Sequence, residues 1–419
     1  MKEGGAVPPY FPKARYRATL AGITVNAFGN GLMSPYVMSW LAALPHGSVR
    51  VAGILFGATG AGQLFATLYA GRILTVRPPR TVLVVGLSFS AASAALLTEA
   101  RGLALAAAAL FTLGLSQGIA SAAQATALGT LKFTAGGEDR VWSHLQVVFN
   151  VGQGIGILGG GYLVSGDLVA KMQPVFLLNA FSFAVFALIA RFTLPGGSPS
   201  RSRTQQQPSG SYLSLLTQRP ARQLVVGDMI FFTFGIGFLL LLPLLASQAH
   251  MLSMRQAAAL LAANTLIIIC CQLTVTRLVR HIRRPAAVRL LFAGAAFSWA
   301  LVALASQAGA RWQSLALVWS AVVLFSMAEC LHTACLVPQL RDAVSEAERS
   351  RILALHVFAG KAGLIVGPAL GGIAISVSVA LPWIMAGCLL AIPAMFRWAE
   401  ITSEESQAVP APDASGDAS

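Results

Sequence analysis

The stretch "AGKAGLIVGPALGG", Ala359 to Gly372, holds one lysine and no other charged residue. It lies within the apolar run 352–377, which is long enough to cross a bilayer as a helix. Its glycines recur at four-residue spacing, which places them in one stripe along a helix. Such a stripe lets a neighbouring helix approach closely. The stretch therefore predicts a tightly packed membrane helix with a cation, Lys361, inside the hydrocarbon layer.

The composition is that of a polytopic membrane protein. The chain has 419 residues, of which 56% are hydrophobic and 11% are charged, and its mean hydropathy is +0.71. Soluble domains carry about 25% charged residues. The formal net charge of +14 is explained by basic cytoplasmic loops. We expect no nucleic-acid partner, because the sequence contains no basic soluble domain that would bind one.

Twelve apolar runs of membrane-spanning length fall into two sets of six. They lie at 18–43, 50–72, 81–98, 102–125, 142–165 and 173–193, then at 224–247, 256–279, 287–307, 313–337, 352–377 and 379–398. The fold class predicted is an all-α membrane protein with 12 transmembrane helices in two six-helix bundles. The segments expected are a cytoplasmic N-terminus (1–17), an N-terminal bundle (18–193), a cytoplasmic linker (194–223), a C-terminal bundle (224–398) and a disordered cytoplasmic tail (399–419).

Basic residues indicate the orientation of these helices. With both termini in the cytoplasm, 23 of the 29 Lys and Arg residues lie inside and five lie outside, while Lys361 remains in the membrane. Cytoplasmic loops are enriched in Lys and Arg. We therefore expect a multi-pass protein of the bacterial inner membrane with both termini cytoplasmic.

The two halves repeat each other in sequence. "FGNGL" (Phe28–Leu32) is echoed by "FGIGF" (Phe234–Phe238), and "GQGIGILGGG" (Gly152–Gly161) is echoed by "GLIVGPALGG" (Gly363–Gly372) 211 positions later. Parallel repeats of six helices predict two bundles, related by a pseudo-twofold axis, around a central cavity.

This arrangement resembles the major facilitator superfamily over nearly the whole chain. That family's antiporter signature is GxxxGPxxGG, and the eleventh predicted helix matches it at Gly363, Gly367, Pro368, Gly371 and Gly372. The fifth helix carries a second copy at Gly152, Gly156, Gly160 and Gly161, with Ile157 in place of proline. The family's diagnostic copy lies in the fifth helix, so the better copy in the eleventh weakens the antiporter inference. Plain helix packing remains the alternative for both stripes.

Two further motifs of the family are altered. In "LFTLGLSQGIASAA" (Leu110–Ala123), Gln117 and Gly118 match the fourth-helix motif, but Gly114 replaces the arginine associated with proton coupling. After the second helix, Thr75 replaces the expected aspartate. The resemblance still implies the major facilitator fold and a drug-efflux-type exporter, for which Glu329 in the tenth helix is a typical acidic residue.

Charged and titratable side chains inside the membrane are concentrated in the second half. They are Asp228, Glu329, His332, His356 and Lys361. A charge in hydrocarbon costs on the order of 3 kcal/mol or more, so such residues are usually functional. Glu329 and Lys361 lie at similar depths, roughly 10 and 14 Å from the cytoplasmic helix ends. We hypothesise that they pair and change partner or protonation during transport, with His332 and Asp228 extending a proton relay.

Other interpretations of these residues stay open. The Glu329–Lys361 pair is structural in one alternative, and in another Lys361 holds an anionic group of the substrate. Asp228 near the start of the seventh helix would be favoured there by the helix dipole, and either histidine would serve packing. Neutral polar residues are expected to line the cavity or to bridge helices: Asn26, Asn30, Gln63, Gln117, Gln124, Asn150 and Asn264.

The sequence contains no Walker glycine loop, nucleophile elbow or metal-ligand spacing. We therefore expect no enzyme, no cofactor and no bound metal. We predict a monomeric secondary active transporter that exports a small amphipathic organic compound, such as a drug, an antibiotic or a secondary metabolite, by proton antiport with alternating access. Its partners would be this small-molecule substrate, protons and the lipid bilayer. The alternatives are a siderophore exporter, a proton-coupled importer of a small solute, and a sensor or lipid scramblase on the same scaffold.

Overall fold

A computed structural model describes residues 12–129, 138–196, 212–248, 252–396 and 398. Every regular element in these ranges is a helix, so the all-α fold class is confirmed. Residues 1–11 of the predicted N-terminus, 197–211 of the predicted linker and the predicted tail 399–419 lie outside the described residues.

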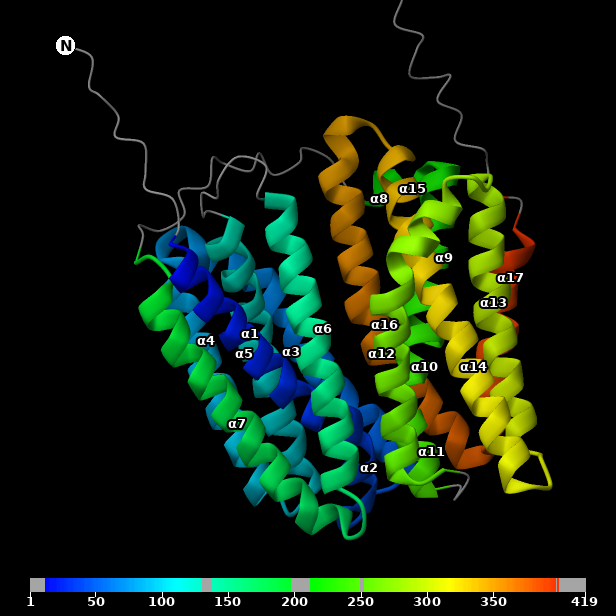
Figure 1. Ribbon diagram of the computed structural model, residues 1–419, viewed down its shortest axis with the longest axis horizontal. Coiled ribbons are helices and arrows are strands. Elements are labelled where there is room, and N and C mark those ends of the chain that lie inside the picture. Colours follow the sequence, from blue (N-terminus) through cyan, green and yellow to red (C-terminus); the bar gives the residue numbers. More distant parts are fainter. Residues whose placement is uncertain (1–11, 130–137, 197–211, 249–251, 397, 399–419) are drawn as a thin grey trace, which may run out of the picture.

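The helices stand side by side in two groups, the first and second bundles (Figure 1). The first bundle consists of α1 (Lys13–Met33), η1 (Ser34–Tyr36), α2 (Val37–Ala43), α3 (Val49–Val76), α4 (Pro79–Leu96), η2 (Leu97–Glu99), α5 (Leu103–Gly129), α6 (Glu138–Leu163) and α7 (Leu168–Thr193). The second consists of α8 (Tyr212–Thr217), α9 (Arg219–Ile230), η3 (Phe231–Ile236), α10 (Gly237–Leu239), α11 (Leu242–Gln248), α12 (Met254–Val279), α13 (Arg284–Ala305), α14 (Arg311–Leu331), η4 (His332–Leu336), α15 (Val337–Asp342), η5 (Glu346–Glu348), α16 (Arg349–Val377) and α17 (Leu381–Met395).

Nine helices in the described part of the chain are long and apolar enough to cross a membrane. Each of the other three predicted intervals also contains helix. The first holds α1 and α2, which η1 with its proline Pro35 separates, and α1 opens with three basic residues. The fifth holds α6, which opens with charged residues, and the twelfth holds the shorter apolar helix α17. The seventh predicted helix begins earlier than expected, at Arg219 rather than 224, because Pro220 occupies a favourable first-turn position.

We call the end of the molecule at which α1 begins and α17 ends the proximal end, and the opposite end the distal end (Figure 1). The glycine stripes pack helices together within each bundle. A Cβ atom on Gly152, Gly156 or Gly160 of α6 would collide with carbonyl oxygens of α1. The equivalent glycines of α16, Gly363 and Gly367, pack in the same way against η3.

Four helices make the close contacts between the two bundles. On one side α3 packs on α16, where a Cβ on Gly53 would lie 2.6 Å from the Pro368 carbonyl oxygen and one on Gly372 would lie 2.7 Å from that of Val49. On the other side α6 packs on α12, where Gly161 meets Ala258. For the glycines that the structure describes, every close contact between the bundles falls in the distal halves of these helices. The bundles therefore approach each other closely on the distal side, which we call the closed side.

Candidate functional site

A carboxylate held by two histidines lies inside the second bundle. Asp228 of α9 is fully buried, and its Oδ1 lies 2.8 Å from Nε2 of His332, the first residue of η4. Its Oδ2 lies 2.7 Å from Nδ1 of His356 on α16. Three segments far apart in the sequence are thus joined through one side chain. We call Asp228, His332 and His356 the aspartate–histidine cluster.

The surroundings of the cluster follow from two π-helices. The π-helix η3 begins three residues after Asp228, and η4 begins at His332 itself. The ring of Phe231 stacks on His332 with centroids 4.3 Å apart, and the ring of Phe232 contacts both histidines. Such wide helical turns are frequent at functional sites. The aromatic rings exclude water, which strengthens the hydrogen bonds of Asp228.

The protonation state of Asp228 decides which ring nitrogens carry hydrogen. An ionised carboxylate only accepts hydrogen bonds, so Nε2 of His332 and Nδ1 of His356 are both donors while Asp228 is ionised. Each imidazole keeps a second nitrogen that can take up a further proton. The side chain of His356 is 20% exposed, whereas those of His332 and Asp228 are 5% and 0% exposed. His356 is therefore the member of the cluster that solvent can reach most readily.

The helix-dipole interpretation of Asp228 is wrong. Because α9 begins at Arg219, Asp228 is its tenth residue and lies beyond the first turn, where the dipole acts. Its carboxylate is hydrogen-bonded to two histidine side chains instead.

The hypothesised pair of Glu329 and Lys361 is absent from the described residues, because each side chain has another partner. Oε2 of Glu329 accepts a 3.0 Å hydrogen bond from Nδ2 of Asn264, which also bonds Ser326. Glu329 is thus directed from α14 toward α12. The Nζ atom of Lys361 donates a 2.7 Å hydrogen bond to Oε1 of Gln63 on α3.

The Lys361–Gln63 hydrogen bond connects the two bundles near the middle of their helices. Lys361 is the thirteenth of the 29 residues of α16, and Gln63 is the fifteenth of the 28 residues of α3. Directly on its distal side, Gly57 and Gly60 of α3 pack against Ile365 of α16. Both polar side chains are only partly buried. The bond therefore stands at the edge of the closed distal interface.

Gln63 is positioned by an unusually close contact between α3 and α5. A Cβ on Gly114 would overlap the carbonyl group of Thr59, and Gly118 packs on the backbone of Gln63. The position of Gly114, where the family motif has arginine, is thus filled by the backbone of α3. A cation at this place is incompatible with the observed packing.

The remaining predicted polar residues fall into smaller contacts. Nε2 of Gln117 donates to Oδ1 of Asn30, and Nε2 of Gln146 donates to Oδ1 of Asn150, both at 3.2 Å. The Oδ1 atom of Asn26 is buried and accepts no hydrogen bond from the residues described. Gln124 is partly buried on α5. The predicted site residues of the first bundle are thus neutral amides, whereas those of the second include the charged ones.

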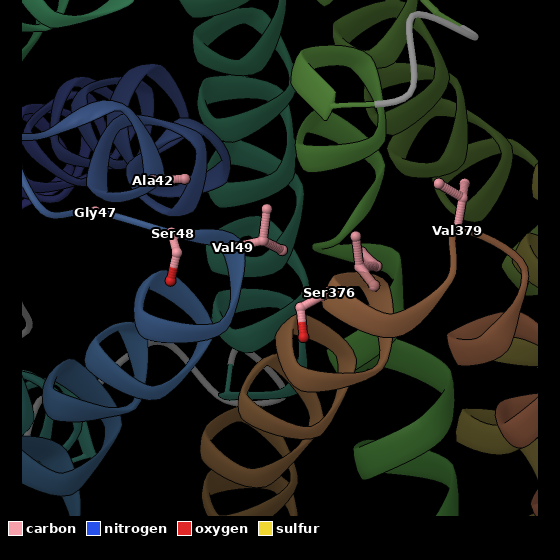
Figure 2. Close-up of a pocket in the computed structure, with 7 residues that line it drawn as sticks. Ala42, Gly47, Ser48, Val49, Ser376 and Val379 are labelled. Carbon is pink, nitrogen blue, oxygen red and sulfur yellow. The ribbon is translucent and has the colours of Figure 1, made fainter.

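The distal end carries contacts that the sequence did not indicate. The guanidinium of Arg255 on α12 lies 4.5 Å above the centroid of the Tyr162 ring on α6. A pocket of about 440 Å³ lies where α2 and the start of α3 face the end of α16 (Figure 2). Its lining includes Ser48 and Ser376 from the two bundles.

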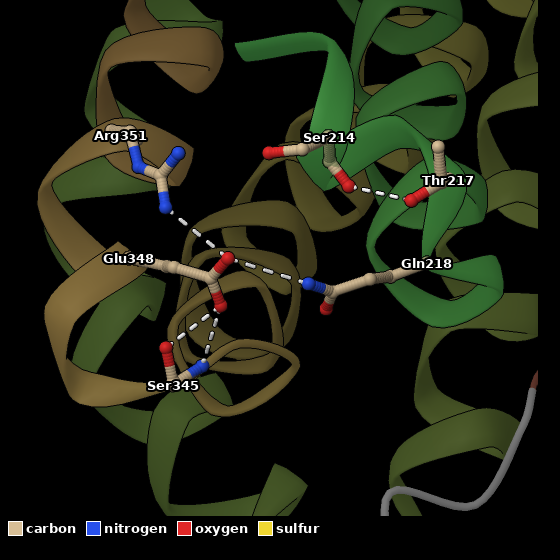
Figure 3. A network of polar contacts seen from close by, with 6 residues as sticks. All are labelled: Ser214, Thr217, Gln218, Ser345, Glu348 and Arg351. Atoms are coloured by element: carbon tan, nitrogen blue, oxygen red, sulfur yellow. Dashed lines mark hydrogen bonds and ion pairs between the residues drawn. The ribbon is translucent and has the colours of Figure 1, made fainter. Parts of the chain in front are cut away.

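A polar network at the proximal end was also missed. Glu348 of η5 contacts Gln218 and Arg351 through Oε1, and Ser345 through Oε2 (Figure 3). The hydrogen bond from the Ser345 side chain holds the pKa of Glu348 below its usual value. The Ser-x-x-Glu pattern of a capping box was the available signal. The network ties the segment before α9 to the start of α16.

Comparison with known proteins agrees with this architecture. The family model of the Major Facilitator Superfamily matches residues 19–336. No curated protein matches the chain.

Solved structures share the fold at low sequence identity. The nucleoside transporter NupG is 11% identical with a TM-score of 0.73, and the match covers 91% of this chain and 97% of that one. A POT family transporter in complex with 5-aminolevulinic acid is also 11% identical with a TM-score of 0.73, covering 90% and 94%. A bacterial homolog of the human lysosomal transporter Spinster, inward-facing and unoccupied, is 14% identical with a TM-score of 0.68, covering 93% and 95%.

Proposed function

The chain belongs to the Major Facilitator Superfamily, and on that premise we propose that it exports a small amphipathic organic compound by proton antiport. It is a multi-pass membrane transporter and not an enzyme. In the proposed cycle the two bundles rock about a site near the middle of the membrane, so that access alternates between the two sides.

The observation that carries this proposal is the burial of Asp228. A charged group in the membrane interior is costly and marks proton relays and substrate paths. Asp228 is completely buried yet bonded to two groups that can each take up a proton. Three other charged side chains on neighbouring elements have partners outside the cluster: Glu329 bonds Asn264, Lys361 bonds Gln63, and Arg351 bonds Glu348. The cluster is therefore the best candidate for the proton site.

The packing offers a route from proton binding to movement. Phe232 contacts both histidines and also packs against Gly360 and Gly363 of α16. A change of charge in the cluster alters how α9, η4 and α16 attract one another. Because α16 is also the helix that packs on α3, this change would reach the interface between the bundles.

The closed distal side is consistent with an exporter in the conformation that precedes substrate binding. We place the proximal end in the cytoplasm, because most Lys and Arg residues lie in the loops at that end. A carrier closed distally would then take its substrate from the cytoplasm.

The test is accumulation of a panel of antibiotics and dyes in an efflux-deficient bacterial host. We would compare the wild type with Asp228→Asn and His356→Gln, with and without a protonophore. Asp342→Asn is the matched control, because Asp342 forms an exposed ion pair with Arg284 outside the cluster. We expect the wild type and the control to lower accumulation of a compound, and the protonophore to abolish this decrease. The two cluster variants, at equal expression, should not lower accumulation. Wild-type export by both cluster variants, with unchanged protonophore sensitivity, would refute the assignment.

A proton-coupled importer is the second candidate function. One observation favours it: α16 carries His356 and Lys361 only five positions apart. A proton bound at the cluster adds positive charge near Lys361, so a proton and an anion would bind together, as in symport. Uptake of a labelled solute that rises when the outside is made acidic would favour import over export.

A further inference from the structure

We propose that Lys361 and Gln63 together bind a carboxylate of the transported compound, which is therefore an amphipathic organic anion. This inference rests on the proposed function only in that the chain moves a small organic compound. It does not depend on proton coupling or on the direction of transport.

Lys361 has no counter-charge in the part of the chain described. No carboxylate oxygen lies within the 4.0 Å that defines an ion pair from its Nζ atom. Its one described hydrogen bond goes to the neutral oxygen of Gln63. An ammonium group has three donors, so two remain for a ligand. An uncompensated cation at this depth is costly, and an anionic ligand would offset that cost.

Gln63 supplies the second half of a carboxylate site. Its Oε1 accepts from Lys361, while its Nε2 amide group has no partner among the described residues. A carboxylate has two oxygens, of which one would accept from Nζ of Lys361 and the other from Nε2 of Gln63.

The position suits a ligand that arrives from the proximal side. On the distal side the path is closed by the contacts of Gly57 and Gly60 with Ile365. A ligand would stop where the closed interface begins, and both side chains are partly exposed there. The binding pair also spans both bundles, since Lys361 lies on α16 and Gln63 on α3. Ligand binding would thus act directly on the contact that must break.

The neighbouring charges do not oppose an anion. Within the described membrane helices of the first bundle, acidic residues occur only near helix ends, as at Glu99 and Glu138. In the second bundle, Glu329 is held toward α12 by Asn264, and Asp228 is covered by its two histidines. A cationic substrate would meet Lys361 without a free carboxylate to compensate its charge.

The test is thermal stabilisation of the purified full-length chain in detergent, where no proton gradient exists. The probes are a library of small amphipathic carboxylic acids, each paired with its own primary amide, together with chloride. The variants are Lys361→Met, Lys361→Arg and Gln63→Leu. Lys13→Met is the matched control, because Lys13 is exposed at the start of α1.

We expect stabilisation by a subset of the acids and by none of their amides. Lys361→Met should weaken the apparent affinity about tenfold or more, as loss of a charge-assisted hydrogen bond predicts. Lys361→Arg should retain part of it, Gln63→Leu should weaken it less, and Lys13→Met should behave as the wild type. A melting profile of Lys361→Met without ligand that matches the wild type would show that the fold is intact.

Four outcomes would overturn the inference. They are stabilisation by amides equal to that by acids, stabilisation by chloride equal to that by the best acid, acid binding that survives Lys361→Met, and a library in which no acid stabilises the wild type. A failure of proton coupling in the accumulation assay would leave these binding results untouched, so the two proposals can fail separately.

Discussion

Lys361 of α16 and Gln63 of α3 form a 2.7 Å hydrogen bond that joins the two bundles at the inner edge of their closed interface. The bond is neutral on one side, so it holds the interface without the strength of an ion pair. A transporter must break such contacts in every cycle, and a weak contact suits this role.

Turning this hydrogen bond into an ion pair should slow transport. Gln63→Glu places a carboxylate against Lys361, and two opposite unit charges about 4 Å apart attract each other by about 4 kcal/mol at an effective dielectric constant of about 20. We expect transport at least about tenfold slower at normal expression, measured by the accumulation assay. Gln313→Glu, at an exposed position near the start of α14, is the control. Adding Lys361→Gln to the Gln63→Glu chain removes the ion pair and should restore part of the transport rate. A double variant that transports as slowly as Gln63→Glu alone would contradict this prediction.

The distal closure should depend on the small size of Gly53. Its Cβ would lie 2.6 Å from the carbonyl oxygen of Pro368, so Gly53→Leu would hold α3 away from α16. We expect loss of transport together with faster thiol labelling of a cysteine placed at Ser376 in the distal pocket. Gly71→Leu on the same helix meets no atom within 4 Å and should leave both measurements unchanged. Equal labelling of the two variants would show that the glycine contact does not close this side.

The two histidines of the cluster should differ in their effect on stability. His332 is buried and stacked on Phe231, whereas water can reach His356 and replace its hydrogen bond. His332→Leu should lower the free energy of unfolding by about 1–3 kcal/mol, the cost of an unmade buried hydrogen bond. His356→Leu should cost less, and denaturant unfolding in detergent would measure both. A larger loss of unfolding free energy for His356→Leu than for His332→Leu would contradict this prediction.

The proximal network should weaken in acid. The Ser345 hydrogen bond lowers the pKa of Glu348, so the folded state favours the ionised carboxylate more than the unfolded state does. This stabilisation is complete above the ordinary glutamate value of 4.5 and is lost as the pH falls below it. Hydrogen exchange of α8 and η5 should therefore rise in that range. At neutral pH, Glu348→Gln should reproduce this rise. Glu346→Gln should not, because the Glu346 side chain is 90% exposed. Hydrogen exchange that changes neither with pH nor with Glu348→Gln would show that the network does not hold these two segments together.

The sequence was sufficient for the fold because membrane helices are apolar runs whose length the bilayer dictates. It failed for the pairing of Glu329 with Lys361. Equal depth follows from counting residues, but the face that a helix turns to its neighbours depends on packing all around it. Asp228, His332 and His356 are titratable residues of the types found at proton sites, so the sequence identified them as candidates. Their meeting depends on the wide turns η3 and η4, for which the apolar pattern has no signature.

Those wide turns distinguish the two halves of a molecule whose sequence repeats. In the described chain both π-helices lie in the second bundle, in the segments that carry Asp228 and His332. Such π-turns are rare inside helices and are frequent at functional sites, so these two segments are candidates for the part of the second bundle that rearranges. The two bundles, although their sequences repeat, would therefore differ in stiffness. The first bundle would then move as a rigid body, and the second would change its internal shape as the carrier opens. The two bundles would contribute unequally to the opening movement.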